Sequence, residues 1–266
     1  MPRHLFRVDF ERRRTGQGQE PIVFILEGKG LTRSFGGVQA VRNLDFSLDE
    51  TKILGLIGPN GAGKTTLFNL VAGVFRPNSG GIRFLGKEIT GLKPFQICHR
   101  GIGRTFQIVK PFGSLTVLEN VGIGARFGKS TQVLDRFDPL PMAEEALEFV
   151  GLMKEKDILC ENLNLGDKKR VELARVLATQ PKLVLLDEVM AGLNPVETAQ
   201  VMSLIQKMRA ARGITIFMIE HVMKAVMGIS DWVLVMHHGE KIAEGPPEKI
   251  VKDPIVIEAY LGERII

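Results

Sequence analysis

The spacing of hydrophobic and polar residues predicts an α/β protein built from short strands and amphipathic helices. Early in the chain, short apolar runs separated by Gly, Asn and Asp turns predict successive strands at Ile22–Leu26, Asp45–Leu48 and Ile53–Ile57. The third run leads into a Gly-rich loop and then into Thr65–Ala72, which has helical character. A strand, a loop and a helix in this order form half of a parallel α/β unit.

A second set of α/β elements is predicted more than a hundred residues later. Lys182–Leu186 and Ile214–Ile219 are continuous apolar runs of the kind found in buried parallel strands. Val196–Ala211 between them is helical in its spacing, and Trp232–Met236 has the pattern of a further strand. The two sets together predict one mainly parallel core sheet.

The chain between these two sets is predicted to be a helical subdomain inserted into the core. Met142–Met153 and Asp167–Ala178 carry apolar residues at helical spacing, whereas strand-like runs are few there. Residues before Ile22 are polar, Arg-rich and unpatterned, as in a mobile extension. The predicted organisation is an extension over 1–21 and a single domain over 22–266, with its core in 22–107 and 181–250, its helical subdomain in 108–180 and its C-terminal tail in 251–266.

Composition excludes several classes of protein. The hydrophobic share of 44% and the charged share of 24% are those of a globular chain, and the net charge of +5 is only mildly basic. Cys98 and Cys160 lie far apart, so neither a zinc site nor a disulfide framework is indicated. The sequence shows neither a secretory signal pattern nor an uninterrupted apolar run of about 18 residues. A membrane role would therefore require a partner.

The most specific motif is a phosphate-binding loop. Residues 58–65 match the pattern GxxxxGK[ST], after a predicted buried strand and before a predicted helix. Glycines allow backbone N–H groups to surround phosphates, Lys64 would reach the β- and γ-phosphates, and Thr65 would bind Mg²⁺. A Gly-rich turn with a solvated lysine is the plain alternative. The predicted ATP-binding residues of this segment are Gly58, Pro59, Asn60, Gly61, Ala62, Gly63, Lys64, Thr65 and Thr66.

Two carboxylates follow the buried run at residues 183–186. Asp187 would hold the Mg²⁺ shell, and Glu188 would orient or deprotonate the attacking water. Taken alone, such a pair is more often an ordinary turn, so its weight comes from the phosphate-binding loop. His221 follows the predicted strand Ile214–Ile219 and could meet the γ-phosphate; the other four histidines are interpreted as ordinary exposed or structural residues.

Phe35 is the candidate for contact with the nucleotide base. Its ring face could stack on adenine, because aromatic stacking tolerates any base edge. A phenylalanine of the hydrophobic core is an equally good interpretation of the same residue.

With these elements in this order, the chain resembles the ATP-binding cassette (ABC) ATPases over nearly its whole length from about residue 26. The resemblance implies a P-loop NTPase fold with an antiparallel β part, and it adds a Q-loop at residues 104–107 and a D-loop at 191–195. Gln107 would touch Mg²⁺ or the water and sense the helical subdomain. The implied signature segment, which contacts the nucleotide of a partner subunit, comprises Leu163, Asn164, Leu165, Gly166 and Asp167.

Within that superfamily, the chain looks most like the branched-chain amino acid uptake ATPases of the LivG type. The resemblance is carried by the sequences of residues 103–107, 191–195, 219–221, 226–231 and 259–263. The resemblance implies ATP and Mg²⁺ as ligands and a second ABC ATPase as dimer partner. It also implies two membrane permeases, an extracytoplasmic solute-binding protein and a peripheral location on the cytoplasmic face of the membrane. In this family the helical subdomain docks onto permease loops.

Two segments depart from the family pattern. The signature normally reads close to LSGGQ, but here Asn164 and Leu165 replace Ser and the first Gly, and Asp167 stands where Gln or Glu is usual. Asn164 can still donate a hydrogen bond, and Asp167 could cap its helix or repel phosphate. Val189 replaces a proline after the two carboxylates, which is expected to loosen that turn.

Three alternatives remain open from the sequence. Related ATPases that serve the transport of urea, short amides or lipopolysaccharide share much of the same motif sequence. An ABC ATPase of DNA repair or translation would act on nucleic acid, although Leu163 follows Gln107 by only 56 positions, which leaves no room for the long coiled coil of repair types. A cassette with an altered signature could also be the regulatory half of a pair. Nucleic acid is not the expected partner.

Overall fold

The computed structural model of the protein describes residues 24–107, 111–128 and 138–261. The described chain divides into two units. One contains the residues up to Pro94 and those from Ser230 onward, and the other is Phe95–Ile229. The predicted extension over 1–21 lies outside the described residues, and the predicted subdomain boundaries at 108 and 180 remain predictions.

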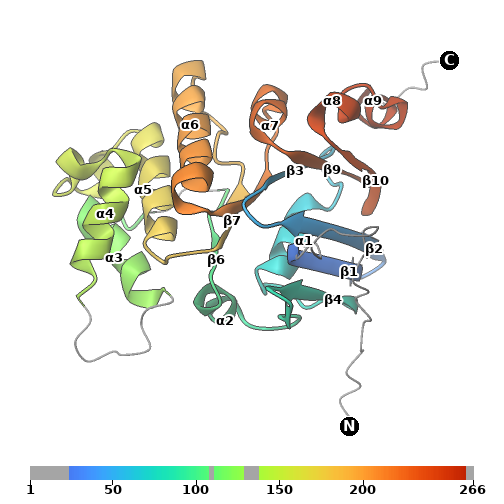
Figure 1. Ribbon diagram of the computed structural model, residues 1–266, viewed down its shortest axis with the longest axis horizontal. Coiled ribbons are helices and arrows are strands. Elements are labelled where there is room, and N and C mark those ends of the chain that lie inside the picture. The colour runs from blue at the N-terminus through green and yellow to red at the C-terminus, as the bar shows by residue number, and fades with distance from the viewer. Residues whose placement is uncertain (1–23, 108–110, 129–137, 262–266) are drawn as a thin grey trace, which may run out of the picture. The chain divides into compact units, whose positions relative to one another are not determined.

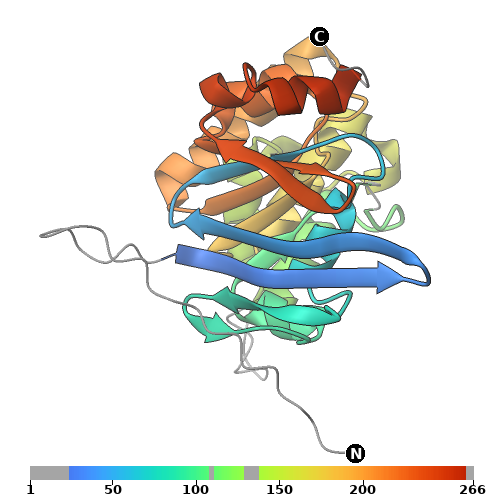
Figure 2. The ribbon, with the colours of Figure 1, turned by 90° about the vertical axis from the view of Figure 1, so that its right-hand side faces the viewer.

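The first unit contains an antiparallel sheet of four strands. Its strand order is β2-β1-β4-β5, formed by β1 (Phe24–Phe35), β2 (Val38–Asp49), β4 (Ser79–Phe84) and β5 (Lys87–Glu88). The two long strands β1 and β2 are the blue arrows of Figure 2. The described part of the predicted strand Ile22–Leu26, from Phe24 on, belongs to the much longer β1, and the predicted strand Asp45–Leu48 belongs to β2. The β1 pairing continues past its glycines because register shifts, including one between Gly28 and Leu31, absorb the irregularity.

The first unit also contains the strand that leads into the phosphate-binding loop. This strand, β3 (Ile53–Ile57), has exactly the predicted bounds and pairs in parallel with β9 (Trp232–His237), which pairs antiparallel with β10 (Glu240–Gly245). All five β3 residues are buried. The helices of this unit are α1 (Lys64–Val71), α8 (Pro247–Ile250) and α9 (Pro254–Leu261).

The second unit contains three parallel strands and most of the helices. Its strands β6 (Ile102–Arg104), β7 (Leu183–Asp187) and β8 (Thr215–Ile219) pair in the order β6-β7-β8. Every residue of β7 and β8 is buried, as expected of parallel strands covered on both faces. The prediction of a mainly parallel core with an antiparallel part is thus confirmed.

The helices of the second unit are α2 (Pro94–His99), α3 (Val117–Phe127), α4 (Leu140–Val150), α5 (Leu165–Leu177), α6 (Pro195–Arg212) and α7 (Met223–Ile229), with 3₁₀ turns at Met153–Glu155 and Cys160–Asn162. Helices α3, α4 and α5 pack against one another (Figure 1). In the parts of the chain that are described, no helix combines the length and apolarity that crossing a bilayer requires.

One helix boundary predicted from the sequence is wrong. The predicted helix Met142–Met153 ends at Val150, because Gly151 adopts a left-handed conformation with φ of 75° and its N–H caps the last turn. Met153 belongs instead to a separate 3₁₀ turn. The helices predicted at Thr65–Ala72, Asp167–Ala178 and Val196–Ala211 are confirmed to within two residues.

Candidate functional site

The phosphate-binding loop joins β3 to α1 in a conformation that requires glycine. Gly58, Gly61 and Gly63 have φ angles of 151°, 79° and 101°. A Cβ atom on Gly58 would collide with the carbonyl oxygen of Met236, and one on Gly63 would collide with that of Ala40, whereas a Cβ on Gly61 would meet nothing within 4 Å. The first and third glycines therefore fit the loop closely onto the neighbouring strands, while the second faces open space.

Lys64 spans this loop from the start of α1. Its Nζ donates hydrogen bonds to the carbonyl oxygens of Gly58 at 2.6 Å and Pro59 at 2.9 Å, and the residue is only 6% exposed. Gly63, at the N-cap position, offers no capping side chain to the amides of the first helical turn. A helix start with such amides and a nearby ammonium group is suited to binding phosphate. Thr65 is exposed beside them, as a metal or phosphate contact would require.

Phe35 lies at the end of β1 and is 39% exposed, which does not fit the alternative of a core phenylalanine. Its ring meets Phe75 edge-on, with 5.1 Å between ring centroids. The Arg33 guanidinium carbon lies 4.6 Å from the Phe35 centroid. These neighbours fix the orientation of a partly exposed ring, as a base-stacking platform requires.

Asp187, in the second unit, is a buried carboxylate at the end of β7. It is 2% exposed, and its Oδ2 lies 2.8 Å from Nη2 of Arg104 on β6. The Asp187 backbone N–H donates to Oγ1 of Thr105 at 3.1 Å. Contacts with the neighbouring segment therefore hold Asp187 by both its backbone and its side chain. The ion pair with Arg104 places a positive charge against this carboxylate.

Glu188 brings together the three predicted catalytic residues. Its Oε2 accepts a hydrogen bond from Nε2 of Gln107 at 2.8 Å, and its Oε1 lies 2.9 Å from Nε2 of His221. The Glu188 side chain is 14% exposed and that of His221 46%. A carboxylate held on one side by an amide and on the other by an imidazole is well placed to orient a water molecule.

The backbone at Glu188 is in an unusual conformation. Its φ is 51°, a value that residues other than glycine rarely adopt. Its N–H donates to the carbonyl oxygen of Ile219 at 2.9 Å, and its carbonyl oxygen accepts from Nζ of Lys169 at 3.3 Å. Backbone strain of this kind is maintained only where the surroundings fix it, and it is common at functional sites.

The turn after Glu188 is also fixed, despite Val189 in place of proline. Val189 is buried, and the Met190 N–H donates to Oε1 of Glu220 at 2.8 Å. Glu220 is 2% exposed, and burial raises its pKa to about 7. The buried carboxylate thus supports the turn that a proline would otherwise stiffen.

The predicted signature segment forms the start of α5. Asn164 is the N-cap residue: its Oδ1 accepts from the Asp167 N–H at 2.8 Å, and its Nδ2 donates to Oδ2 of Asp167 at 2.8 Å. Asp167 also pairs with Arg170. The predicted cap therefore exists, but Asn164 rather than Asp167 is the capping residue, and the Asp167 charge is balanced by Arg170. Leu165 is 45% exposed, so it presents an apolar surface at this helix start.

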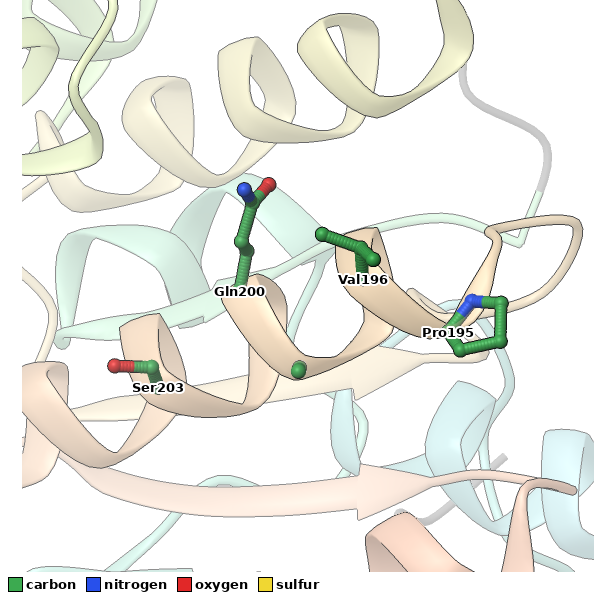
Figure 3. Close-up of a pocket in the computed structure, with 5 residues that line it drawn as sticks. Pro195, Val196, Gln200 and Ser203 are labelled. Atoms are coloured by element: carbon green, nitrogen blue, oxygen red, sulfur yellow. The ribbon is translucent and has the colours of Figure 1, made fainter.

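The predicted D-loop ends at the start of α6. Asn194 caps this helix and forms a reciprocal capping box with Glu197. A shallow surface pocket lies along the same helix, and its lining side chains project from one face of α6 in Figure 3. It is lined by Pro195, Val196, Ala199, Gln200 and Ser203. None of these residues is ionisable, and none belongs to the predicted nucleotide site.

The residues predicted to bind Mg²⁺ fit that ion by their chemistry. Thr65, Gln107 and Asp187 offer a hydroxyl, an amide oxygen and a carboxylate, which are ligand types that Mg²⁺ prefers. Within the described residues there is no group of three or more His, Cys, Asp or Glu side chains that could hold a metal by itself. This set of ligand types suits Mg²⁺, which is usually bound by one or two carboxylates together with phosphates and water.

Sequence reasoning missed four residues that support this site: Arg104, Lys169, Glu172 and Glu220. Arg104 and Glu220 stand directly inside or beside motifs that the sequence already identified. The sequence signal for Lys169 and Glu172 was of another kind. Lys169 stands at helical spacing from the buried Leu173, and Glu172 stands at the same spacing from the buried Val176. Charged residues in the apolar stripe of a helix indicate a buried polar function.

Comparisons with known proteins place this geometry in a family. The family model described as "ABC transporter" matches residues 41–191. A second model, described as "Branched-chain amino acid ATP-binding cassette transporter", matches residues 240–265. The two matches cover both the phosphate-binding loop and the C-terminal part of the chain.

Similar curated proteins cover nearly the whole chain. The high-affinity branched-chain amino acid transport ATP-binding protein BraF of Pseudomonas aeruginosa is 41% identical over 250 residues, which is 90% of this chain and 98% of BraF. LivG of Escherichia coli, described in the same words, has the same identity and coverage. The probable LivG of Archaeoglobus fulgidus is 35% identical over 246 residues, or 90% of this chain and 95% of that protein.

Two solved structures agree closely with the fold. A nucleotide-free ATP-binding cassette from an ABC transporter has a TM-score of 0.83 at 32% sequence identity, over 90% of this chain and 100% of that one. The ADP conformation of an ATP-binding cassette of an ABC transporter has a TM-score of 0.82 at 32% identity, over 90% and 99%. The same fold is therefore known both without nucleotide and with ADP.

Proposed function

The chain belongs to the ABC transporter ATP-binding proteins of the LivG and BraF type, and from this membership we propose that it is the ATP-hydrolysing subunit of an importer for branched-chain amino acids. Its relatives carry that substrate class in their names, and one of the two matching family models does so as well. The chain is an ABC ATPase. The solute itself would bind to other subunits of the transporter.

In this proposal the phosphate-binding loop holds the nucleotide. The loop amides and Nζ of Lys64 bind the β- and γ-phosphates, and Phe35 stacks on adenine. Thr65, Asp187 and Gln107 hold Mg²⁺, which neutralises charge on the phosphates. The closely fitted glycines at 58 and 63 and the buried Lys64 support this role.

The observation that carries the catalytic part is the arrangement around Glu188. Gln107 and His221 engage the two oxygens of its carboxylate at 2.8 and 2.9 Å. We propose that Glu188 orients and deprotonates the attacking water, that His221 contacts the γ-phosphate, and that Gln107 reports occupancy of the site to the helical subdomain. Each role needs a side chain with restricted orientation, and these contacts provide the restriction.

The proposed assembly is a dimer of ATPase subunits. The signature residues Leu163–Asp167 would contact the ATP bound to the partner subunit, so the dimer closes when nucleotide bridges both faces and opens after hydrolysis. Two membrane permeases and an extracytoplasmic solute-binding protein complete the transporter. The chain would then be peripheral on the cytoplasmic face, where the helical subdomain passes its motion to the permeases.

The test of this function is the variant Glu188→Gln. We expect the rate of ATP turnover by the purified chain to fall at least about 100-fold, while ATP-dependent dimerisation measured by light scattering persists, since the amide keeps the shape but cannot take a proton. Glu248→Gln, the same change in an exposed residue of α8, is the matched control. Unchanged turnover in Glu188→Gln would remove Glu188 from its role.

A further inference from the structure

Two buried charged residues lie on the helix that begins with the signature segment. Lys169 is 3% exposed and Glu172 is 4% exposed, and both belong to α5. Three positions apart, they lie on the same face of the helix. Burying a charged side chain costs free energy unless specific partners compensate it, so their contacts indicate why they are there.

Lys169 contacts the catalytic carboxylate residue through its backbone. The ammonium group donates to the carbonyl oxygen of Glu188 at 3.3 Å. The backbone N–H of Glu188 donates to the carbonyl oxygen of Ile219 at 2.9 Å. Both peptide groups that flank Glu188 are therefore hydrogen-bonded, and its φ is 51°. Lys169 thereby helps to maintain the unusual backbone conformation from which the Glu188 side chain projects.

Glu172 contacts the segment that carries Gln107. Its Oε1 accepts from the backbone N–H of Phe106 at 2.9 Å, one residue before Gln107. Gln107 in turn donates from Nε2 to Oε2 of Glu188 at 2.8 Å. Glu172 thus fixes the backbone from which Gln107 reaches Glu188.

A third buried ionisable residue, Glu220, contacts the turn after Glu188. Glu220 accepts from the Met190 N–H, and it directly precedes His221. Burial raises the pKa of Glu172 and that of Glu220, and the positive charge of Lys169 counteracts both rises, while burial lowers the pKa of Lys169 itself. Removing this ammonium group would take away a positive charge that offsets the burial of both carboxylates.

We propose that Lys169 and Glu172 are positioning residues, which transmit the state of the signature end of α5 to Gln107 and Glu188 of the same subunit. This inference rests on the proposed function. A plain structural role would explain the burial of the two side chains, but it would not require both to contact the backbone at or directly beside catalytic residues. A movement of α5 on contact with the partner's nucleotide would then alter the geometry of the Glu188 carboxylate.

The experiment compares Lys169→Met with Lys169→Arg in the purified full chain with MgATP. We expect Lys169→Met to lower kcat at least about 10-fold while KM for ATP and the Kd of a fluorescent ATP analogue stay within about twofold. Lys169→Arg can still donate to the Glu188 carbonyl and should recover kcat to within about threefold of the wild type. Lys168→Met is the matched control, because Lys168 lies on the same helix as Lys169 but its ammonium donates to the carbonyl oxygen of Glu161, in the preceding 3₁₀ turn, at 3.0 Å.

The pair Glu172→Leu and Glu172→Gln tests the same inference should Lys169→Met fail to fold. Glutamine keeps an oxygen for the Phe106 N–H and should preserve kcat, whereas leucine should lower it about 10-fold at unchanged KM. Equal losses in Lys169→Met and Lys168→Met, or unchanged kcat in both Lys169→Met and Glu172→Leu, would overturn the inference. A wild-type chain without MgATP turnover would instead contradict the proposed function.

Discussion

Arg104 and Asp187 form a buried ion pair, with 2.8 Å between Nη2 and Oδ2 and side chains that are 11% and 2% exposed. The pair joins the ends of the parallel strands β6 and β7. Asp187 is also the carboxylate that we propose for the Mg²⁺ shell, so the guanidinium and the metal ion would interact with the same group. We therefore expect the position of Arg104 to affect both stability and metal binding.

Arg104→Met should lower the free energy of unfolding by about 3 kcal/mol, because it leaves the Asp187 carboxylate buried without this cation. Saturating MgATP should then raise the melting temperature of the variant by more than it raises that of the wild type, since bound metal supplies the missing positive charge. Thermal unfolding with and without MgATP measures both quantities. Equal MgATP shifts in the two proteins would contradict a shared role of Asp187.

The loop glycines should differ in their tolerance of a side chain. Gly58→Ala should destabilise the fold by at least about 2 kcal/mol more than Gly61→Ala, because both positions have positive φ but only the first would press a Cβ against the Met236 carbonyl. Gly61→Ala is thus the matched control. Urea unfolding without nucleotide measures the difference, and equal free energies of unfolding would contradict the described fit of the loop.

Glu220 should make stability depend on pH. Burial raises its pKa from 4.5 to about 7, so folding is favoured while the carboxyl is protonated and this contribution is lost as pH rises through 7. Glu220→Gln removes this dependence. We expect the free energy of unfolding of the variant, relative to the wild type, to rise by about 3 kcal/mol between pH 5 and pH 8. Urea titrations at both pH values measure it, and parallel pH curves would contradict the raised pKa.

The buried elements and the motifs were predictable from the sequence because both depend on local pattern. The continuous apolar run Ile53–Ile57 became β3 with the same bounds, and the predicted strand Lys182–Leu186 became β7 (Leu183–Asp187), shifted by one residue at each end. The spacing of the phosphate-binding glycines and the Asp-Glu pair identified the candidate site residues without reference to coordinates.

What the sequence could not provide was contact between distant segments. Glu172 lies 66 residues from Phe106 and Lys169 lies 19 residues from Glu188, and nothing in the spacing of either residue indicates which backbone it contacts. The length of β1 was missed because its glycines interrupt the apolar pattern, although register shifts keep the strand paired with β2. The end of α4 was missed because the left-handed conformation of Gly151 competes with the apolar pattern that continues to Met153.

The loop at residues 58–66 is proposed to bind ATP together with Mg²⁺. Calorimetric titration of the purified chain with ATP tests it most directly, with Mg²⁺ or with EDTA, in the wild type and in Lys64→Met. Lys52→Met, which alters an exposed lysine paired with Asp231, is the control. We predict that the wild type and Lys52→Met bind ATP with Mg²⁺ and that EDTA weakens this binding at least about 10-fold. Lys64→Met should bind ATP with Mg²⁺ at least about 30-fold more weakly than the wild type. No binding of ATP to the wild type with Mg²⁺ present, or equal affinity in Lys64→Met, would contradict the claim.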